Sequence, residues 1–100
     1  MIEDLDPVIH APKRLAAMAV LSAATSATFP FLREHLGVSD SDLSKQMATL
    51  EKAGYVAVSK TGRGRGATTS YRITRAGRTA YSRHRRALAA ILAEDPDPGG

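Results

Sequence analysis

VSDSDLSKQMATLEKAGYV, residues 38–56, predicts a helix over 39–53 followed by a strand over 55–59. Ser39 and Asp42 form the S-x-x-D pattern in which the first side chain caps a helix N-terminus. The strand is rich in β-branched and aromatic residues and follows directly on a glycine. This stretch therefore sets the element order on which the rest of the prediction depends.

The two faces of the predicted helix differ in chemistry. One face carries large apolar residues, and the other is small, hydrogen-bonding and basic, without long acidic side chains at its centre. A DNA major groove admits such a face, because small side chains allow close approach to base edges. The alternative is an ordinary solvated helix face. The candidate DNA-binding residues of this helix are Ser39, Ser41, Ser44, Lys45, Thr49 and Lys52.

The preceding segments predict two further helices. Residues 30–36 carry Leu32 and Leu36 at i, i+4 spacing, and Gly37 then supplies a left-handed helix end. A helix, a short glycine-containing turn and a second helix are typical of a helix-turn-helix, although many helical hairpins share that spacing. Residues 27–29 predict a short strand. Residues 11–25 predict a first helix that is apolar on nearly every side, which indicates either a core helix or a second buried surface against another subunit.

A basic loop, KTGRGRG over residues 60–66, follows the strand, and residues 68–74 predict a partner strand. The guanidinium groups of arginines on a glycine-rich, flexible loop can bind phosphates or enter a narrow minor groove. The string GRGRGA also fits the G-x-G-x-x-A dinucleotide fingerprint, but that fingerprint needs a helix after it, and a Thr-rich strand follows here. The candidate DNA-binding residues of this loop are Lys60, Thr61, Arg63, Arg65 and Thr68.

The charge distribution is strongly polarised along the chain. Residues 52–93 contain ten Lys or Arg and no Asp or Glu, although the net charge of the whole chain is only +4. The acidic residues lie in the first half and in the last seven residues. This asymmetry favours a polyanionic partner, and the alternative is a solvated basic face.

A long last helix is predicted over residues 75–93, with Thr74 as its N-cap. Its apolar stripe is longer than a small domain needs, which favours a homodimer seam over packing within the chain. The candidate dimer-interface residues are Leu15, Met18, Tyr81, His84, Leu88 and Ile91.

Several classes of chemistry find no support in the sequence. One hundred residues without cysteine indicate one small domain and exclude disulfides, thiolate metal sites and cysteine nucleophiles. His10, His35 and His84 are far apart in the chain, and no G-x-S-x-G elbow is present. The N-terminus has no signal-peptide pattern, and the longest apolar stretch is about half a membrane span. We expect no enzyme activity, no metal, no cofactor and no membrane, and a cytoplasmic location; His84 is an interface residue or a mild pH sensor.

Three segments carry a resemblance to a known family. They are residues 6–15, residues 38–56, and YRITRAG at 71–77, which fits a Y-x-[LI]-T-x-x-G entry into the last helix. Over residues 6–92 the chain resembles winged helix-turn-helix transcriptional regulators of the MarR/ArsR type, in particular their short single-domain group. The resemblance implies an α+β, mostly α fold with a two- to three-stranded antiparallel wing and a long C-terminal helix.

The same resemblance implies roles for the segments. Residues 39–53 would be the recognition helix and 61–67 the wing, and the first and last helices would form the dimer. We expect an N-terminal arm over 1–9, a DNA-binding and dimerisation domain over 10–93, and a disordered acidic tail over 94–100.

The expected function is that of a homodimeric, sequence-specific regulator of transcription. It would bind double-stranded DNA at a near-palindromic operator, as a repressor. Two alternatives stay open at this point. One is a ligand-responsive regulator whose small-molecule effector binds at the dimer interface. The other is a protein-interaction winged helix that docks an acidic partner.

Overall fold

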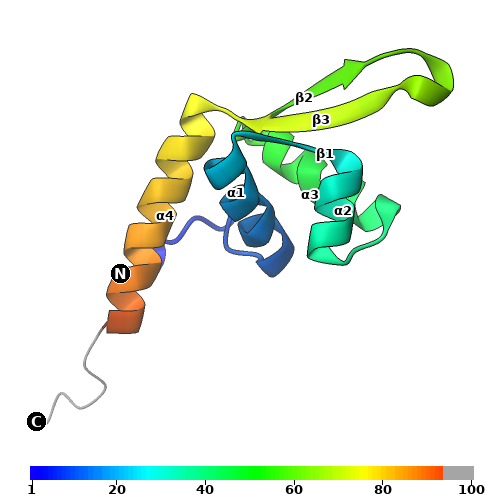
Figure 1. Cartoon of the computed structure of the whole chain (residues 1–100). Helices are drawn as coiled ribbons and strands as arrows, with labels where there is room; N and C mark the ends of the chain where they lie inside the picture. Colours follow the sequence, from blue (N-terminus) through cyan, green and yellow to red (C-terminus); the bar gives the residue numbers. More distant parts are fainter. Residues whose placement is uncertain (94–100) are drawn as a thin grey trace, which may run out of the picture.

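The structure is a computed structural model that describes residues 1–93, and it shows a mostly helical α+β fold with one three-stranded antiparallel sheet (Figure 1). This confirms the predicted fold class, including the long C-terminal helix. The predicted disordered tail, 94–100, lies outside the described residues. The elements in chain order are η1 (Ile2–Asp4), α1 (Pro12–Ala24), β1 (Ser26–Thr28), α2 (Phe29–Leu36), α3 (Asp40–Lys52), β2 (Val56–Thr61), η2 (Gly64–Gly66), β3 (Thr68–Ile73) and α4 (Arg75–Ala93).

The sheet has the strand order β1-β3-β2, so the last strand of the chain lies in its centre. β2 and β3 form a hairpin whose register runs from Val56 opposite Ile73 at the base to Thr61 opposite Thr68 at the tip. β1 pairs with the base of β3 only, with Ala27 opposite Tyr71. The hairpin is therefore anchored at its base and projects as a wing beyond the helices (Figure 1).

The core lies where α1, α2 and α3 meet the base of the sheet. Its buried apolar side chains come from all of these elements and from the segment before α1, and burial of such side chains is the main stabilising contribution in a domain of this size. They are Ile9, Ala17, Met18, Leu21, Leu32, Leu43, Met47, Leu50, Val56, Tyr71 and Ile73. Because Ile9 is fully buried here, the predicted arm over 1–9 ends inside the core.

The helix ends follow from local sequence signals. Pro12 lies in the first turn of α1, where its missing N–H costs no hydrogen bond. The Thr28 hydroxyl accepts a hydrogen bond from Phe31 N at 3.2 Å, so α2 begins at Phe29, one residue earlier than predicted. Gly37 ends α2 in the left-handed conformation, with φ of +68°, as expected.

A tight junction joins the end of α3, the start of β2 and the first turn of α4. Thr74 donates its hydroxyl to Gly54 O at 2.6 Å and accepts from Gly77 N at 2.9 Å, which caps α4 as predicted. Thr74 N also donates to Tyr55 O at 3.0 Å. At Gly77 an added Cβ would lie 2.1 Å from Tyr55 O, so the two backbones approach more closely than any side chain allows.

The first half of α4 contacts α1. Arg78 donates to Ser22 O at 3.3 Å and to the Thr25 hydroxyl at 3.2 Å, and so ties α4 to the C-terminal end of α1. Beyond this region the helix runs away from the other helices, and η1 lies beside it (Figure 1). Within residues 1–93, no helix is both long and apolar enough to cross a membrane.

Gly77→Ala tests the junction. In an ordinary helix this change stabilises by up to about 1 kcal/mol, but here the methyl group meets the Tyr55 carbonyl. We expect the free energy of unfolding to fall by at least about 2 kcal/mol in equilibrium urea denaturation. Gly66→Ala is the matched control, because an added Cβ there has no heavy atom within 4 Å. Equal stabilities of the two variants would contradict the close approach.

Candidate nucleic-acid interface

α3 presents its two faces as the sequence predicts. Leu43, Met47 and Leu50 are fully buried on the inner side. The candidate DNA-binding residues lie outside: Ser39, Ser41, Ser44, Lys45 and Lys52 are exposed, and Thr49 is half-buried. The outer face thus combines small hydroxyl side chains with two lysines and offers little steric obstruction to a groove.

The hydroxyl groups of Ser39 and Thr49, at the two ends of this face, already form hydrogen bonds within the protein. The Ser39 hydroxyl accepts from Asp42 N at 3.1 Å and caps α3. Thr49 donates its hydroxyl to Lys45 O at 3.2 Å, one turn back along the helix. Thr49 therefore keeps an acceptor and a methyl group for a ligand, whereas Ser44 and Lys45 keep their donors.

Two acidic residues in the first turn of α3 are neutralised by other elements. Arg33 of α2 lies 2.8 Å from Asp40 Oδ1. Lys13 of α1 forms an ion pair with Asp42, and Gln46 donates to the other oxygen of that carboxylate at 3.1 Å. The hydrogen bond from Lys13, followed by that from Gln46, lowers the pKa of Asp42. These partners reduce the repulsion that two carboxylates would exert on an approaching phosphate.

Gln46 is a residue that the sequence reasoning missed. Its side-chain oxygen accepts from Arg14 Nη1 at 2.8 Å, while its nitrogen is held by Asp42. Arg14 in turn donates through Nε to Val8 O. The amide orientation of Gln46 is thereby fixed, and α1 and α3 are joined beside the exposed face. The partners are far apart in the chain, so no local signal identifies them.

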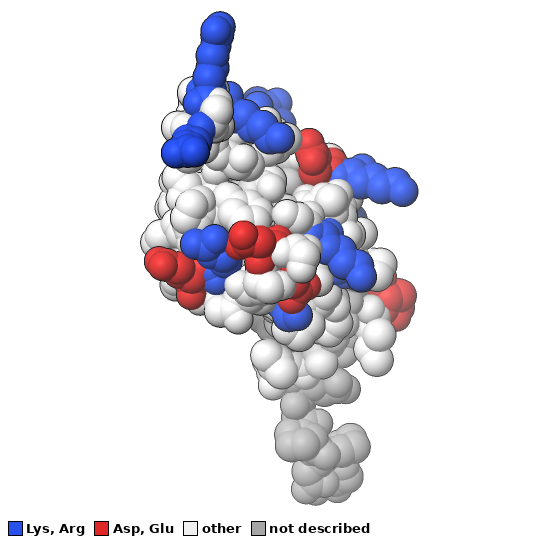
Figure 2. All heavy atoms as spheres, turned by 90° about the vertical axis from the view of Figure 1, so that its right-hand side faces the viewer, with Lys and Arg blue, Asp and Glu red and all other residues white. Residues whose placement is uncertain are grey.

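The wing carries its basic residues on a compact turn. Lys60, Thr61, Arg63, Arg65 and Thr68 are all exposed at its tip. Figure 2 shows Lys and Arg side chains gathered there, at the top of that view, whereas the middle of the same face mixes both signs of charge. The predicted position of the basic loop, between the two strands of a hairpin, is confirmed.

The loop contains a defined turn. Residues 64–66 form the single 3-10 turn η2, with Gly66 N donating to Arg63 O at 3.1 Å. Gly62 has a φ of +85°, and an added Cβ would lie 2.6 Å from Gly66 O. The first glycine is thus required by the turn, which contains Arg65 and is preceded directly by Arg63.

The structure divides the basic run of the sequence into separate places. Lys60, Arg63 and Arg65 lie on the wing, whereas Arg85 and Arg86 lie on α4, which extends away from the wing (Figure 1). The Arg85 guanidinium stacks over Tyr81 at 5.9 Å. The run is therefore not one continuous electrostatic footprint.

The dimer-interface assignments require a correction. Met18 is fully buried and His84 is only 1% exposed within the single chain, so neither can contact a second copy. For both residues the intrachain alternative is correct. Leu15 and Tyr81 are half-buried against the core. The uncovered apolar residues are at the end of α4, where Leu88 and Ile91 are half-buried and Leu92 is 76% exposed.

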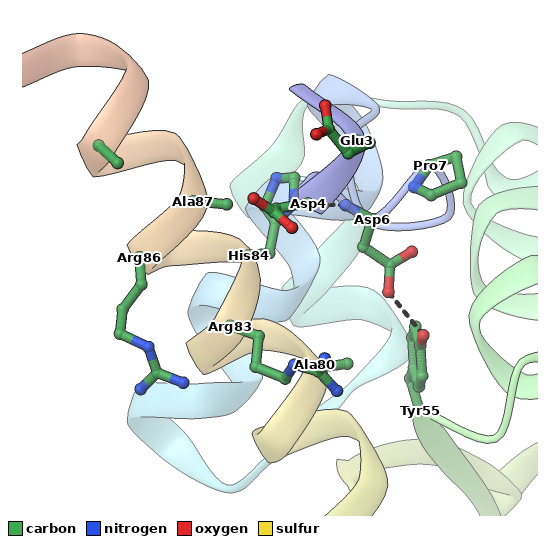
Figure 3. A pocket seen from close by; sticks show the side chains of 11 residues that line it. Glu3, Asp4, Asp6, Pro7, Tyr55, Ala80, Arg83, His84, Arg86 and Ala87 are labelled. Carbon is green, nitrogen blue, oxygen red and sulfur yellow. Dashed lines mark hydrogen bonds between the residues drawn. The ribbon is translucent and has the colours of Figure 1, made fainter. Parts of the chain in front are cut away.

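A groove of about 720 Å³ is lined by the N-terminal arm, Tyr55 and α4 (Figure 3). Glu3, Asp4 and Asp6 line it from the arm, Arg83, His84 and Arg86 lie on α4, and Tyr55 lies beside Asp6 (Figure 3). The charged lining consists of Glu3, Asp4, Asp6, Arg83 and Arg86.

The histidine prediction also changes. Although their sequence separation argued against a cluster, His10 Nδ1 lies 3.3 Å from His84 Nε2. The other ring nitrogen of His84 accepts from Asp6 N at 3.0 Å. Burial, followed by the nearby His10, lowers the pKa of His84, and the charge of Asp6 opposes this shift. Among the described residues, no group of three His, Asp or Glu is arranged to hold a metal ion.

Asp6 is a second residue that the sequence reasoning missed as a site. Its carboxylate accepts from the Tyr55 hydroxyl at 2.6 Å and from Val8 N at 2.9 Å. The hydrogen bond to Asp6, followed by burial, raises the pKa of Tyr55. The Asp6-Pro7 pair is a turn-forming signal that could have identified the bend, but not its partners.

Comparison with known proteins identifies the family. Residues 13–92 match the family described as winged helix DNA-binding domain, so the chain belongs to it. Comparison with curated protein sequences finds no match.

Solved structures of transcriptional regulators share the fold, and a MarR family member is among them. A transcriptional regulator homologue of Pyrococcus horikoshii has 26% identity and a TM-score of 0.80, over 85% of this chain and 84% of its own. YusO of Bacillus subtilis has 20% identity and a TM-score of 0.78, over 91% and 64%. NadR, solved with 4-hydroxyphenylacetate, has 18% identity and a TM-score of 0.65, over 85% and 65%.

Ser39→Ala tests the start of α3. The Asp42 N–H loses its acceptor, so we expect the free energy of unfolding to fall by about 1 kcal/mol in urea denaturation. Ser44→Ala is the control, because Ser44 is exposed on the same helix and is predicted to change stability by less than about 0.5 kcal/mol. If both variants lose the same stability, Ser39 does not act as the cap.

Proposed function

We propose that this chain is a sequence-specific double-stranded DNA-binding regulator of transcription, with α3 in the major groove and the wing on the minor groove or the backbone. The observation that supports this most strongly is the outer face of α3, which is exposed, small and basic and whose two first-turn carboxylates are paired to other elements. Such a face offers donors to base edges without repelling phosphate.

The wing supports the same proposal by a different argument. Arg63 and Arg65 are exposed at the tip of a hairpin whose base is fixed to the core. Guanidinium groups there can donate pairs of hydrogen bonds to phosphate or enter a narrow minor groove. Contacts to phosphate position a protein on DNA, and contacts to base edges supply the specificity. We therefore assign positioning to the wing and reading to α3.

A homodimer would complete the binding unit. Leu88, Ile91 and Leu92 form an apolar end of α4 that its own chain leaves partly or largely uncovered. A second copy that covers them would place two α3 helices about a two-fold axis. The operator would then be near-palindromic, with half-sites about 10 base pairs or a multiple apart. We infer a repressor, which acts by occupying its operator.

A second candidate function is supported by the groove between the arm and α4. NadR has the same fold and was solved with a small aromatic acid. The groove is large enough for a small organic molecule, and it carries both carboxylates and arginines. A ligand that changes duplex affinity would make this protein a ligand-responsive regulator.

Substitutions in α3 and in the wing should affect DNA binding differently. Arg63→Ala combined with Arg65→Ala should weaken binding to all duplexes similarly and lower the salt slope by about 1 per lost phosphate contact. Ser44→Ala or Lys45→Ala should cost about 1–3 kcal/mol on the cognate site and relax preference at one position per half-site. The measurement is an anisotropy titration of cognate and scrambled duplexes at several salt concentrations.

Arg85→Ala combined with Arg86→Ala is the matched control, because it removes the same charge from α4. If this control lowers the salt slope as much as the wing variant does, the wing has no special contact with DNA. If the α3 variants bind as the wild type does, α3 is not the reading helix. Tight salt-dependent binding to an acidic protein, without duplex binding, would favour the protein-interaction alternative.

Leu88→Asp tests the dimer. A charge placed at the uncovered end of α4 would be buried without a partner in the assembly, at a cost of several kcal/mol. We expect light scattering to show a dimer for the wild type at micromolar concentration and a monomer for this variant. Thr79→Asp, exposed on the same helix, should remain dimeric. A wild type that is monomeric under these conditions would contradict the dimer.

A further inference from the structure

His84 is a buried titratable group on α4, and its hydrogen bonds fix its tautomer. Its Nδ1 accepts from the backbone N–H of Asp6 at 3.0 Å. Because a backbone N–H can only donate, Nδ1 carries no hydrogen, and the single hydrogen of the neutral ring lies on Nε2. That hydrogen points to His10 Nδ1, 3.3 Å away, which must then be an acceptor too. Both contacts are satisfied only while His84 and His10 are neutral.

The bonds of His84 are part of a longer chain of hydrogen bonds. Asp6 lies on the arm, and its carboxylate accepts from the Tyr55 hydroxyl at 2.6 Å (Figure 3). Tyr55 in turn donates its backbone N–H to Leu50 O of α3 at 3.0 Å. The hydrogen-bonded chain His10–His84–Asp6–Tyr55 thus joins four parts of the molecule. They are the segment before α1, the middle of α4, the arm, and the end of α3.

The same carboxylate also shapes the arm. Asp6 Oδ1 accepts from Val8 N at 2.9 Å and from Ile9 N at 3.3 Å, which forms the bend that leads Ile9 into the core. A change at His84 is therefore passed to the arm through one residue. η1 also contacts α4, and the arm forms one wall of the groove.

The charges around His84 come from three elements. The arm contributes Asp6 and, along the same groove, Glu3 and Asp4, which favour a protonated ring. Glu3 and Asp4 are also paired with the N-terminal ammonium, at 2.9 Å and 3.7 Å. α4 contributes Arg83 and Arg86, and the segment before α1 contributes His10. All three disfavour a positive charge on the His84 ring. Burial opposes it as well, and its effect on the His84 pKa is the largest.

We propose that the chain His10–His84–Asp6–Tyr55 is a proton-controlled latch that holds the arm on α4 at neutral pH and releases it when His84 is protonated. A proton added at Nδ1 faces the Asp6 N–H, and two donors cannot share a hydrogen bond. The arm then detaches and the groove opens. The middle of α4 loses its link through Asp6 to the Tyr55 side chain, while the junction of Thr74 and Gly77 with residues 54–55 remains. Because α4 and α3 carry the dimer and the DNA contacts of the proposed function, release should weaken binding to duplex DNA.

Amide NMR of the ¹⁵N-labelled protein between pH 7.5 and pH 5.5 tests the latch. In the wild type the Asp6 amide signal should move as the pH falls below about 6.5, the value for an unperturbed histidine. Hydrogen exchange at Val8 and Ile9, corrected for the intrinsic rate at each pH, should accelerate at least about tenfold. The wild-type titration decides the proposal by itself: an Asp6 signal and arm protection that stay constant over this range would overturn it.

Two variants separate His84 from the other histidines. In His84→Asn the side-chain oxygen can accept from Asp6 N but does not titrate, so the arm should stay protected at pH 5.5. His35→Asn is the matched control, because His35 is exposed on α2 and stacks on Phe31, away from the latch. It should behave as the wild type does. An arm that is released equally in His84→Asn would show that another group controls it.

A duplex titration with the same proteins tests the coupling to DNA separately. The ratio of wild-type to His84→Asn affinity should fall at least about fivefold between pH 7.5 and pH 5.5, the lower end of ordinary allosteric couplings. If the arm is released but this affinity ratio does not change with pH, the latch is not coupled to DNA binding. Absence of duplex binding by either protein at any pH would contradict the proposed function, and the NMR result would still decide the latch.

Discussion

The close approach of Gly77 to the carbonyl of Tyr55 is the constraint on which the arrangement of the elements depends. It lets the first turn of α4 lie directly on the chain that links α3 to β2. Thr74 completes the contact from the same turn by capping α4 and bonding to Gly54 O. Backbone contacts at the end of α3 therefore help to set the orientation of the C-terminal helix, together with Ala80 and Tyr81, which pack against the core.

This constraint explains the YRITRAG segment in physical terms. Tyr71 and Ile73 point into the core from the central strand, Thr74 is the helix cap, and Gly77 is the one residue type that fits against the carbonyl. Signals of this kind act over a few residues, which is why helix ends, the wing and the two faces of α3 could be predicted from the sequence. The boundaries that shifted did so by one or two residues, at helix ends, at both ends of β1 and β2, and at the end of β3.

Contacts between distant parts of the chain could not be predicted in the same way. The ion pair of Lys13 with Asp42, the bond of Tyr55 to Asp6 and the contact of His10 with His84 each join different elements. Nothing in local spacing or periodicity distinguishes these residues from others of their type. The same limit explains why the sequence pattern predicts a dimer interface at Met18 and His84 although they are buried within the single chain. An apolar stripe on a helix indicates a buried face, but it does not indicate whether the same chain or a second copy buries that face.

We assign the electrostatic attraction for DNA to the wing and the reading of sequence to α3, whose first-turn acids are paired with Lys13 and Arg33. Selection of bound duplexes from a random-sequence library with the purified chain tests this most directly. We expect enrichment of one motif with two-fold symmetry, whose half-sites lie about 10 base pairs or a multiple apart. Recovery of unenriched sequences after several rounds, from a protein shown to be folded, would contradict it.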